Sequence, residues 1–161
     1  MSVTAPESPV TPRDLEVFGE EVLTAFLLEQ GHPASSAPEG DGGRVHASIA
    51  VTGGWSGHIT LAVSRAGAAV LAPRLLMADE VSEADVTDAV GELVNVLGGN
   101  VKGLLLEESA LGLPQVRTDD VPVPPGAAVQ VCHAELLWAG HPVDVRVWLA
   151  EQDATTPGDN A

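Results

Sequence analysis

The sequence predicts an α+β fold, in which an antiparallel sheet of about five strands packs against an N-terminal helix and a long central helix. Three observations predict it. Two pairs of alternating apolar and polar segments are each joined by a glycine-containing link, which is typical of β-hairpins. Other segments carry apolar residues at helical spacing. Strands follow strands directly, and this order favours an antiparallel sheet over a doubly wound parallel one.

Composition limits the function classes. The chain has 161 residues and is 45% hydrophobic, enough for one packed core. It carries 7 Lys and Arg against 23 Asp and Glu, a net charge of −16 that repels nucleic acid and anionic lipid. With one cysteine, no intrachain disulfide forms. The chain shows no secretory signal and no apolar run of the roughly 18–20 residues that span a membrane. We therefore expect a cytoplasmic protein that binds neither nucleic acid nor membrane.

The first helix is predicted to begin at Thr11-Pro12, a threonine N-cap followed by proline at the first helical position. Gly31 is expected to end this helix. Apolar residues recur at helical spacing between them, namely Leu15, Phe18, Val22 and Phe26. Residues 31–43 contain little that can be buried and are expected to form a flexible loop. We expect one domain over residues 11–150, with residues 1–10 and 151–161 as flexible tails.

The first hairpin is predicted from two segments in which apolar and polar residues alternate, Arg44–Thr52 and residues 55–63. Gly53-Gly54 joins them and is expected to form the turn. The Ala- and Leu-rich segment Ala66–Met77 predicts a helix, and Pro73 leaves open whether it is broken there.

The longest helical pattern runs from Ser82 to Glu107, with Ser82 as its N-cap. A short strand is expected over Leu113–Arg117, followed by a proline-stiffened loop over residues 119–126. The second hairpin is predicted from Ala127–Trp138 and Val143–Leu149.

The long helix has two faces. One is apolar and predicted to be core: Val86, Val90, Leu93, Leu97, Val101 and Leu104. The other, the polar stripe, consists of Asp85, Asp88, Glu92, Asn95, Gly99 and Lys102. Two interpretations of the stripe stay open: an ordinary solvated face, or a docking face. Asparagine and repeated glycines are unfavourable inside a helix, which favours the second, although such glycines also allow close packing.

These residues resemble a known family. Asp88-x-x-x-Glu92-x-x-Asn95, followed by Gly99-Asn100 and Leu113-Pro114, is similar to the signature of the CheX-type chemotaxis phosphatases, whose fold is shared with CheC and with flagellar switch phosphatase modules. The order of elements over residues 11–150 fits that α+β fold. The spacing from Asn95 to Pro114 is shorter than in the family pattern, so whether Pro114 is the motif proline stays open.

The resemblance implies hydrolysis of the aspartyl phosphate on a CheY-like response regulator. Glu92 and Asn95 are then the catalytic residues: Asn95 orients the attacking water, as a glutamine does in GTPases, and Glu92 contacts a lysine of the regulator. Asp88, Gly99 and Lys102 are expected to contact the partner. No cofactor of its own is implied, since Mg²⁺ comes with the regulator. Relatives dimerise through sheet edges, so a homodimer is expected.

The residues alone leave another function open. The alternative is a non-catalytic interaction module that binds a receiver domain or another signalling protein. Metal binding is not expected: His46 and His58 lie on strands predicted to pair, but no metal-ligand spacing is present. Cys132 lies on the apolar phase of its strand and is predicted to be a buried small side chain.

Overall fold

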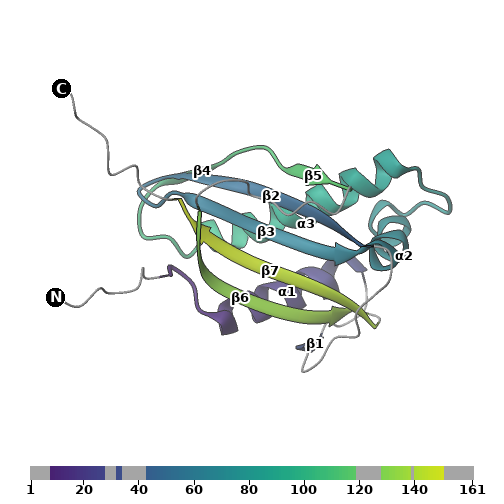
Figure 1. Cartoon of the computed structure of the whole chain (residues 1–161), viewed down its shortest axis with the longest axis horizontal. Helices are drawn as coiled ribbons and strands as arrows, with labels where there is room; N and C mark the ends of the chain where they lie inside the picture. Colours follow the sequence, from purple (N-terminus) through teal and green to yellow (C-terminus); the bar gives the residue numbers. More distant parts are fainter. Residues whose placement is uncertain (1–7, 28–31, 34–42, 119–127, 139, 151–161) are drawn as a thin grey trace.

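The structure is a computed structural model that describes residues 8–27, 32–33, 43–118, 128–138 and 140–150. Within these residues, three helices lie on one face of a twisted antiparallel sheet (Figure 1). Helix α3 (Glu83–Lys102) contacts strands β2 (Arg44–Gly53), β4 (Ser109–Leu111) and β5 (Gln115–Arg117). Helix α1 (Pro12–Leu27) contacts strand β6 (Val129–Trp138). The predicted α+β class is confirmed. None of the helices in the described ranges is long and apolar enough to cross a membrane.

Seven strands form the sheet within the described residues, in the order β1-β6-β7-β3-β2-β4, with β5 also paired to β2. All pairs are antiparallel. The strands are β1 (His32–Pro33), β2 (Arg44–Gly53), β3 (Gly57–Ser64), β4 (Ser109–Leu111), β5 (Gln115–Arg117), β6 (Val129–Trp138) and β7 (His141–Leu149).

Both predicted hairpins are present. The register of β2 and β3 closes at Val51 opposite Gly57, and that of β6 and β7 at Trp138 opposite His141. The hairpins join through β3 and β7, where Leu61 pairs with Val145. Two strands were not predicted, β1 inside the expected loop 31–43 and β4, because two or three residues are too short to show alternation. Residues 34–42, residues 119–126, residues 1–7 of the expected N-terminal tail and the whole expected C-terminal tail, residues 151–161, lie outside the described residues.

The first two helices follow the sequence signals. Helix α1 (Pro12–Leu27) begins after Thr11, whose hydroxyl accepts a hydrogen bond from the Asp14 backbone N–H at 3.1 Å, while the Asp14 carboxylate accepts one from the Thr11 N–H at 2.8 Å. Helix α2 (Arg65–Leu76) runs through Pro73 without a break and ends at Met77.

Helix α3 (Glu83–Lys102) is shorter than predicted. Gly103 caps its C-terminus, and the backbone N–H groups of Leu104 and Leu105 bond three residues back to Val101 and Lys102, which tightens the last turn. The prediction that the helix reaches Glu107 is wrong, and so is the placement of Leu104 in the core, since it is 43% exposed.

One core lies between the sheet and the helices. The strands contribute their alternate residues, such as Ile49, Ile59, Leu61, Val145 and Leu136, and α3 contributes Ala89, Val90, Leu93, Val94, Leu97 and Val101. Cys132 is buried in this core, as predicted. Val10, expected in the N-terminal tail, is also buried and packs against the core. The extent of the domain otherwise stays a prediction.

Two adjacent glycines of α3 differ in their surroundings, which yields a matched stability test. A Cβ built on Gly98 lies 2.8 Å from Cγ2 of the buried, β-branched Ile49, whereas one built on Gly99 has nothing within 4 Å. Alanine favours a helix over glycine by about 1 kcal/mol. We expect Gly99→Ala to raise the free energy of unfolding by up to that amount. Gly98→Ala should lower it by about 1 kcal/mol, because overpacking a core typically costs about 1–3 kcal/mol.

Chemical denaturation of the two single variants beside the wild type measures both changes under identical conditions. Equal shifts of the same sign would contradict the difference in packing.

Candidate functional site: the exposed face of helix α3

The N-terminus of α3 is fixed by its cap. The Ser82 hydroxyl accepts a hydrogen bond from the Asp85 N–H at 3.2 Å, and the Asp85 carboxylate accepts one from the Ser82 N–H at 2.9 Å. This capping box accounts for Asp85, so the polar stripe that remains for function begins at Asp88.

The rest of the polar stripe faces solvent. Asp88, Glu92, Gly99 and Lys102 are exposed, and Asn95 is half-buried. Glu92 and Asn95 are three residues apart, so their Cβ atoms lie about 5–6 Å apart on neighbouring turns. The structure therefore brings the two predicted catalytic residues together on one rigid helix, with a carboxylate and a carboxamide both accessible from outside.

The β4–β5 edge runs beside this stripe. A Cβ atom built on Gly91 would lie 3.4 Å from Cγ2 of Val116 and 3.6 Å from Cβ of Pro114. A Cβ atom built on Gly98 would lie 3.4 Å from Cδ2 of Leu111. Asn95 lies between Gly91 and Gly98 along the helix axis and about 40–60° from them in helical phase, whereas Glu92 is about 100° from Gly91. Asn95 is therefore on the side of the stripe towards the edge strands. Its partial burial follows from this position, whereas Glu92 lies farther from the edge and is exposed.

Pro114 thus packs against the helix that carries the motif, one turn before Asn95. A proline at this position stiffens the link between β4 and β5 and holds it close to α3. The shorter spacing from Asn95 still brings the proline to the motif helix.

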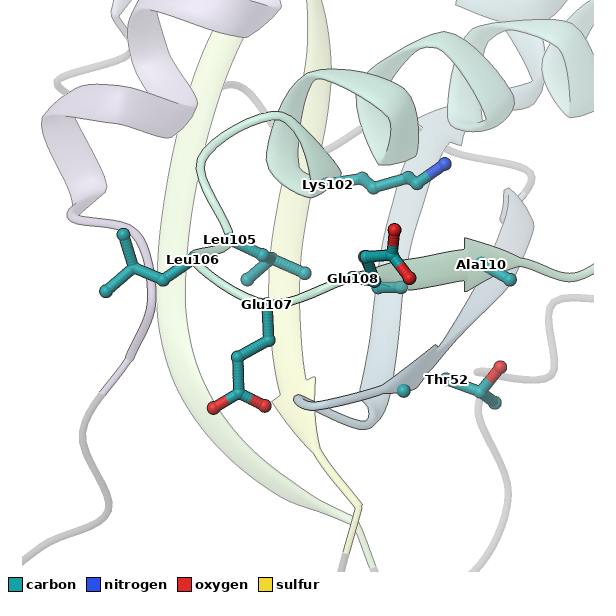
Figure 2. A pocket seen from close by; sticks show the side chains of 9 residues that line it. Thr52, Lys102, Leu105, Leu106, Glu107, Glu108 and Ala110 are labelled. Carbon is teal, nitrogen blue, oxygen red and sulfur yellow. The ribbon is translucent and has the colours of Figure 1, made fainter.

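Gly99 and Lys102 extend the stripe beyond Asn95. An added side chain at Gly99 would point into open space. Lys102 lies two turns after Asn95 and lines an open hollow of about 730 Å³ between the end of α3 and β4 (Figure 2). Glu108 points towards the Lys102 side chain, and Glu107 points away from it. Lys102 is therefore accessible to a partner, at the far end of the stripe from Asp88.

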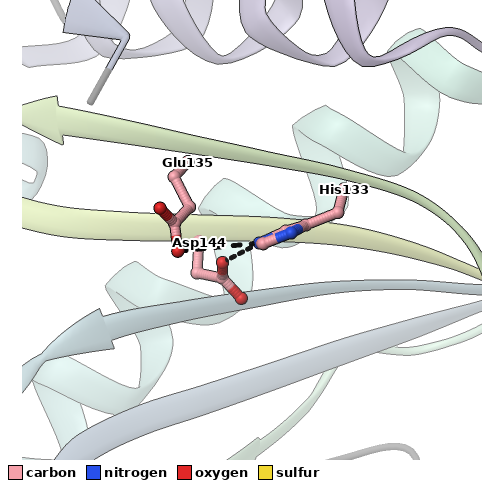
Figure 3. A group of neighbouring side chains, drawn as sticks. All are labelled: His133, Glu135 and Asp144. Atoms are coloured by element: carbon pink, nitrogen blue, oxygen red, sulfur yellow. Dashed lines mark hydrogen bonds and ion pairs between the residues drawn. The ribbon is translucent and has the colours of Figure 1, made fainter. Parts of the chain in front are cut away.

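A second polar cluster lies on the sheet face that turns away from the helices. Asp144 is 5% exposed, and its Oδ2 accepts a hydrogen bond from Arg146 Nε at 2.7 Å. Its Oδ1 pairs with His133 Nε2, and Glu135 lies beside them (Figure 3). This cluster was not predicted from the sequence. The alternation of His133-x-Glu135 on the polar phase of β6 was the available signal.

His133, Glu135 and Asp144 are the group of described residues whose atoms converge closely enough to hold a metal ion. The guanidinium of Arg146 already occupies one Asp144 oxygen and neutralises its charge, so an ion-pair network accounts for the cluster. His46 and His58 do not meet, because they pair with Ala62 and Ala50 respectively. Burial lowers the pKa of His58 and raises the pKa of the Cys132 thiol, which disfavours a thiolate nucleophile there.

Comparisons with known proteins identify the fold to which helix α3 belongs. The family described as chemotaxis phosphatase CheX matches residues 45–123, from β2 past β5, and so includes all of α3. The chain is CheX-like. CheX from Vibrio vulnificus superposes with a TM-score of 0.68 at 15% identity, over 89% of this chain and 99% of that chain. CheX from Desulfovibrio desulfuricans superposes with a TM-score of 0.67 at 19% sequence identity, over 85% of this chain and 97% of that chain.

The CheX–CheY–BeF₃–Mg²⁺ complex from Borrelia burgdorferi also matches, with a TM-score of 0.62 at 15% identity, over 89% of this chain and 100% of that chain. No curated protein sequence is significantly similar to this chain. At these identities the structural matches establish the CheX fold, and the site residues of this chain are argued from its own geometry.

Proposed function

We propose that this CheX-like chain is a phosphatase that hydrolyses the aspartyl phosphate of a CheY-like response regulator. The observation that carries the proposal is the pair of Glu92, which is exposed, and Asn95, which is half-buried, on one face of α3. The existence of a complex between a protein of this fold and a CheY protein bound to BeF₃ and Mg²⁺ supports the choice of partner.

The reaction needs little from this chain. A water oxygen attacks the phosphorus, the bond between phosphorus and the aspartyl oxygen breaks, and inorganic phosphate leaves the free carboxylate behind. The regulator's Mg²⁺ and lysine neutralise the phosphoryl oxygens, so this chain supplies the position of the water. Asn95 does so with its carboxamide, because an oriented hydrogen-bonding group converts a diffusing water into one held in line.

Glu92 sets the register between the two proteins. Its exposed carboxylate, one turn before Asn95, forms an ion pair with the regulator's lysine, and the pair fixes where α3 lies over the phosphoryl group. Asp88, Gly99 and Lys102 contact the regulator on either side. Gly99 allows the partner backbone to come close to the helix, since it has no side chain.

The oligomeric state is part of the same proposal. One edge of β6 pairs with β7 along its length, but on the opposite edge β1 pairs only with Leu136 and Leu137. Most of that edge therefore has no strand partner among the described residues. We propose that two copies pair through this sheet edge, away from α3.

The direct test is release of inorganic phosphate from a CheY-like regulator of the same genome, phosphorylated with acetyl phosphate and Mg²⁺, with and without this chain. Acceleration supports a phosphatase. Binding of the regulator without acceleration would instead support a non-catalytic interaction module.

Replacing Asn95 tests the water-positioning role. We expect Asn95→Ala to abolish the acceleration and to leave binding of the beryllofluoride-loaded regulator nearly intact, because the carboxamide acts mainly in the transition state. Single-turnover phosphate release and a titration of the loaded regulator measure the two quantities. Near-normal rates would contradict the mechanism.

Replacing Glu92 tests the register. Glu92→Lys places a positive charge against the regulator's lysine, so binding itself should weaken by tenfold or more. Glu92→Gln, which removes the charge and keeps the shape, serves as the milder control. A Glu92→Lys variant that binds as tightly as the wild type would rule out the ion pair.

Replacing Gly99 separates stability from function. The open space around Gly99 predicts that Gly99→Leu melts no lower than the wild type. The added side chain should hold the regulator away from Asn95, and a misplacement of about 1 Å can reduce a rate by about a hundredfold. The melting temperature and the rate of phosphate release, measured on the same preparation, test the two expectations. Full activity would mean that no partner approaches this position.

A further inference from the structure

Leu113 is an almost fully exposed apolar side chain, and its neighbour Pro114 packs against the helix that carries Glu92 and Asn95. Leu113 is 87% exposed, in the three-residue link between β4 and β5. The next residue, Pro114, packs against Gly91, one turn before Asn95. Leu113 therefore stands at the rim of the face that we propose to cover the regulator.

The backbone around Leu113 is held on both sides. Leu111 pairs with Val51 and Gln115 pairs with Ser48, so both ends of the link are bound to the same strand, β2. Between them, the Gly112 N–H donates a hydrogen bond to the Ala50 carbonyl at 2.8 Å. The leucine is thus presented on a fixed backbone, and ordering it on binding costs little conformational entropy.

Exposure by itself does not indicate a binding role, since single exposed apolar residues are common on protein surfaces. Leu106 is also fully exposed, but it lies beyond the C-terminal end of α3 in the connection to β4, and its side chain points to the opposite side from that of Lys102 (Figure 2). What distinguishes Leu113 is the combination of a clamped backbone and a place next in sequence to Pro114, which packs against α3 one turn before Asn95. Side chains that become buried in a well-packed, desolvated pocket carry a large share of the affinity in protein interfaces, whereas charges at the rim contribute less.

We propose that Leu113 is an affinity-determining residue that inserts into an apolar depression beside the phosphorylation site of the receiver domain. This inference rests on the proposed function, because it assumes that α3 covers that site. Leu113 holds the receiver in place, and Asn95 acts on the water. The two residues therefore affect different kinetic quantities.

The test compares Leu113→Ala with Leu106→Ala, the same chemical change at an exposed leucine outside the proposed contact. Leu113→Ala should raise KM for the phosphorylated receiver, and Kd for the beryllofluoride-loaded receiver, by about tenfold. It should leave kcat within twofold and the melting temperature unchanged. Leu113→Asp should weaken binding further. Leu106→Ala should change neither KM nor Kd.

The outcomes separate this inference from the proposed function. If the wild type releases phosphate but Leu113→Ala has the wild-type KM and Kd, the inference is overturned and the proposed function stands. An equal loss of binding in Leu106→Ala also overturns it, because the effect is then not local to Leu113. If the wild type binds the loaded receiver without releasing phosphate, the proposed function fails and the Kd of Leu113→Ala decides the inference. If the wild type binds no receiver, both are overturned.

Discussion

The close contact of α3 with the β2, β4 and β5 strands is the constraint on which the site depends. It is possible because Gly91 and Gly98 present no side chain to those strands, so that Ile49, Leu111, Pro114 and Val116 approach the helix directly. A bulkier residue at Gly98 would push the helix off the sheet. Asn95, which lies between the two glycines, would then move relative to the β4–β5 link.

Helix α3 tolerates Asn95 at its middle, although asparagine has a poor helix propensity. Asparagine competes for backbone groups and disfavours a helix. In α3 that cost is offset by the buried apolar face and by the capping box at Ser82. The helix is thus stable enough to present a carboxamide at a fixed position, and a fixed position is what the orientation of a water requires.

Much of this arrangement could be predicted from the sequence. The alternation of apolar and polar residues predicted both hairpins, and the Thr11-Pro12 pair predicted the start of α1. Helical phase separated the buried face of α3 from its exposed face. The pairing of β3 with β7 could not be predicted, because alternation says which residues share a face and nothing about which strands are neighbours. The end of α3 was missed because Leu104 continues the apolar period although Gly103 ends the helix.

The glycines mark the limit of the sequence argument most clearly. Gly91, Gly98 and Gly99 look alike in the sequence, and helical phase alone placed Gly99 on the exposed side. Only the structure shows that Gly98 meets a stiff, buried isoleucine and that Gly99 meets nothing.

The two polar regions of the molecule differ in a way that bears on function. On the outer sheet face, the buried Asp144 has both oxygens paired within the chain, by His133 and Arg146. Such a network is complete without a ligand, and its pairing offsets the cost of burying the carboxylate. On α3, Glu92 is exposed and Asn95 is half-buried, and neither has a comparable enclosure among the described residues. In our proposal a partner that brings its own cation and lysine completes this second region, and this difference favours the helix over the sheet as the place of the proposed chemistry.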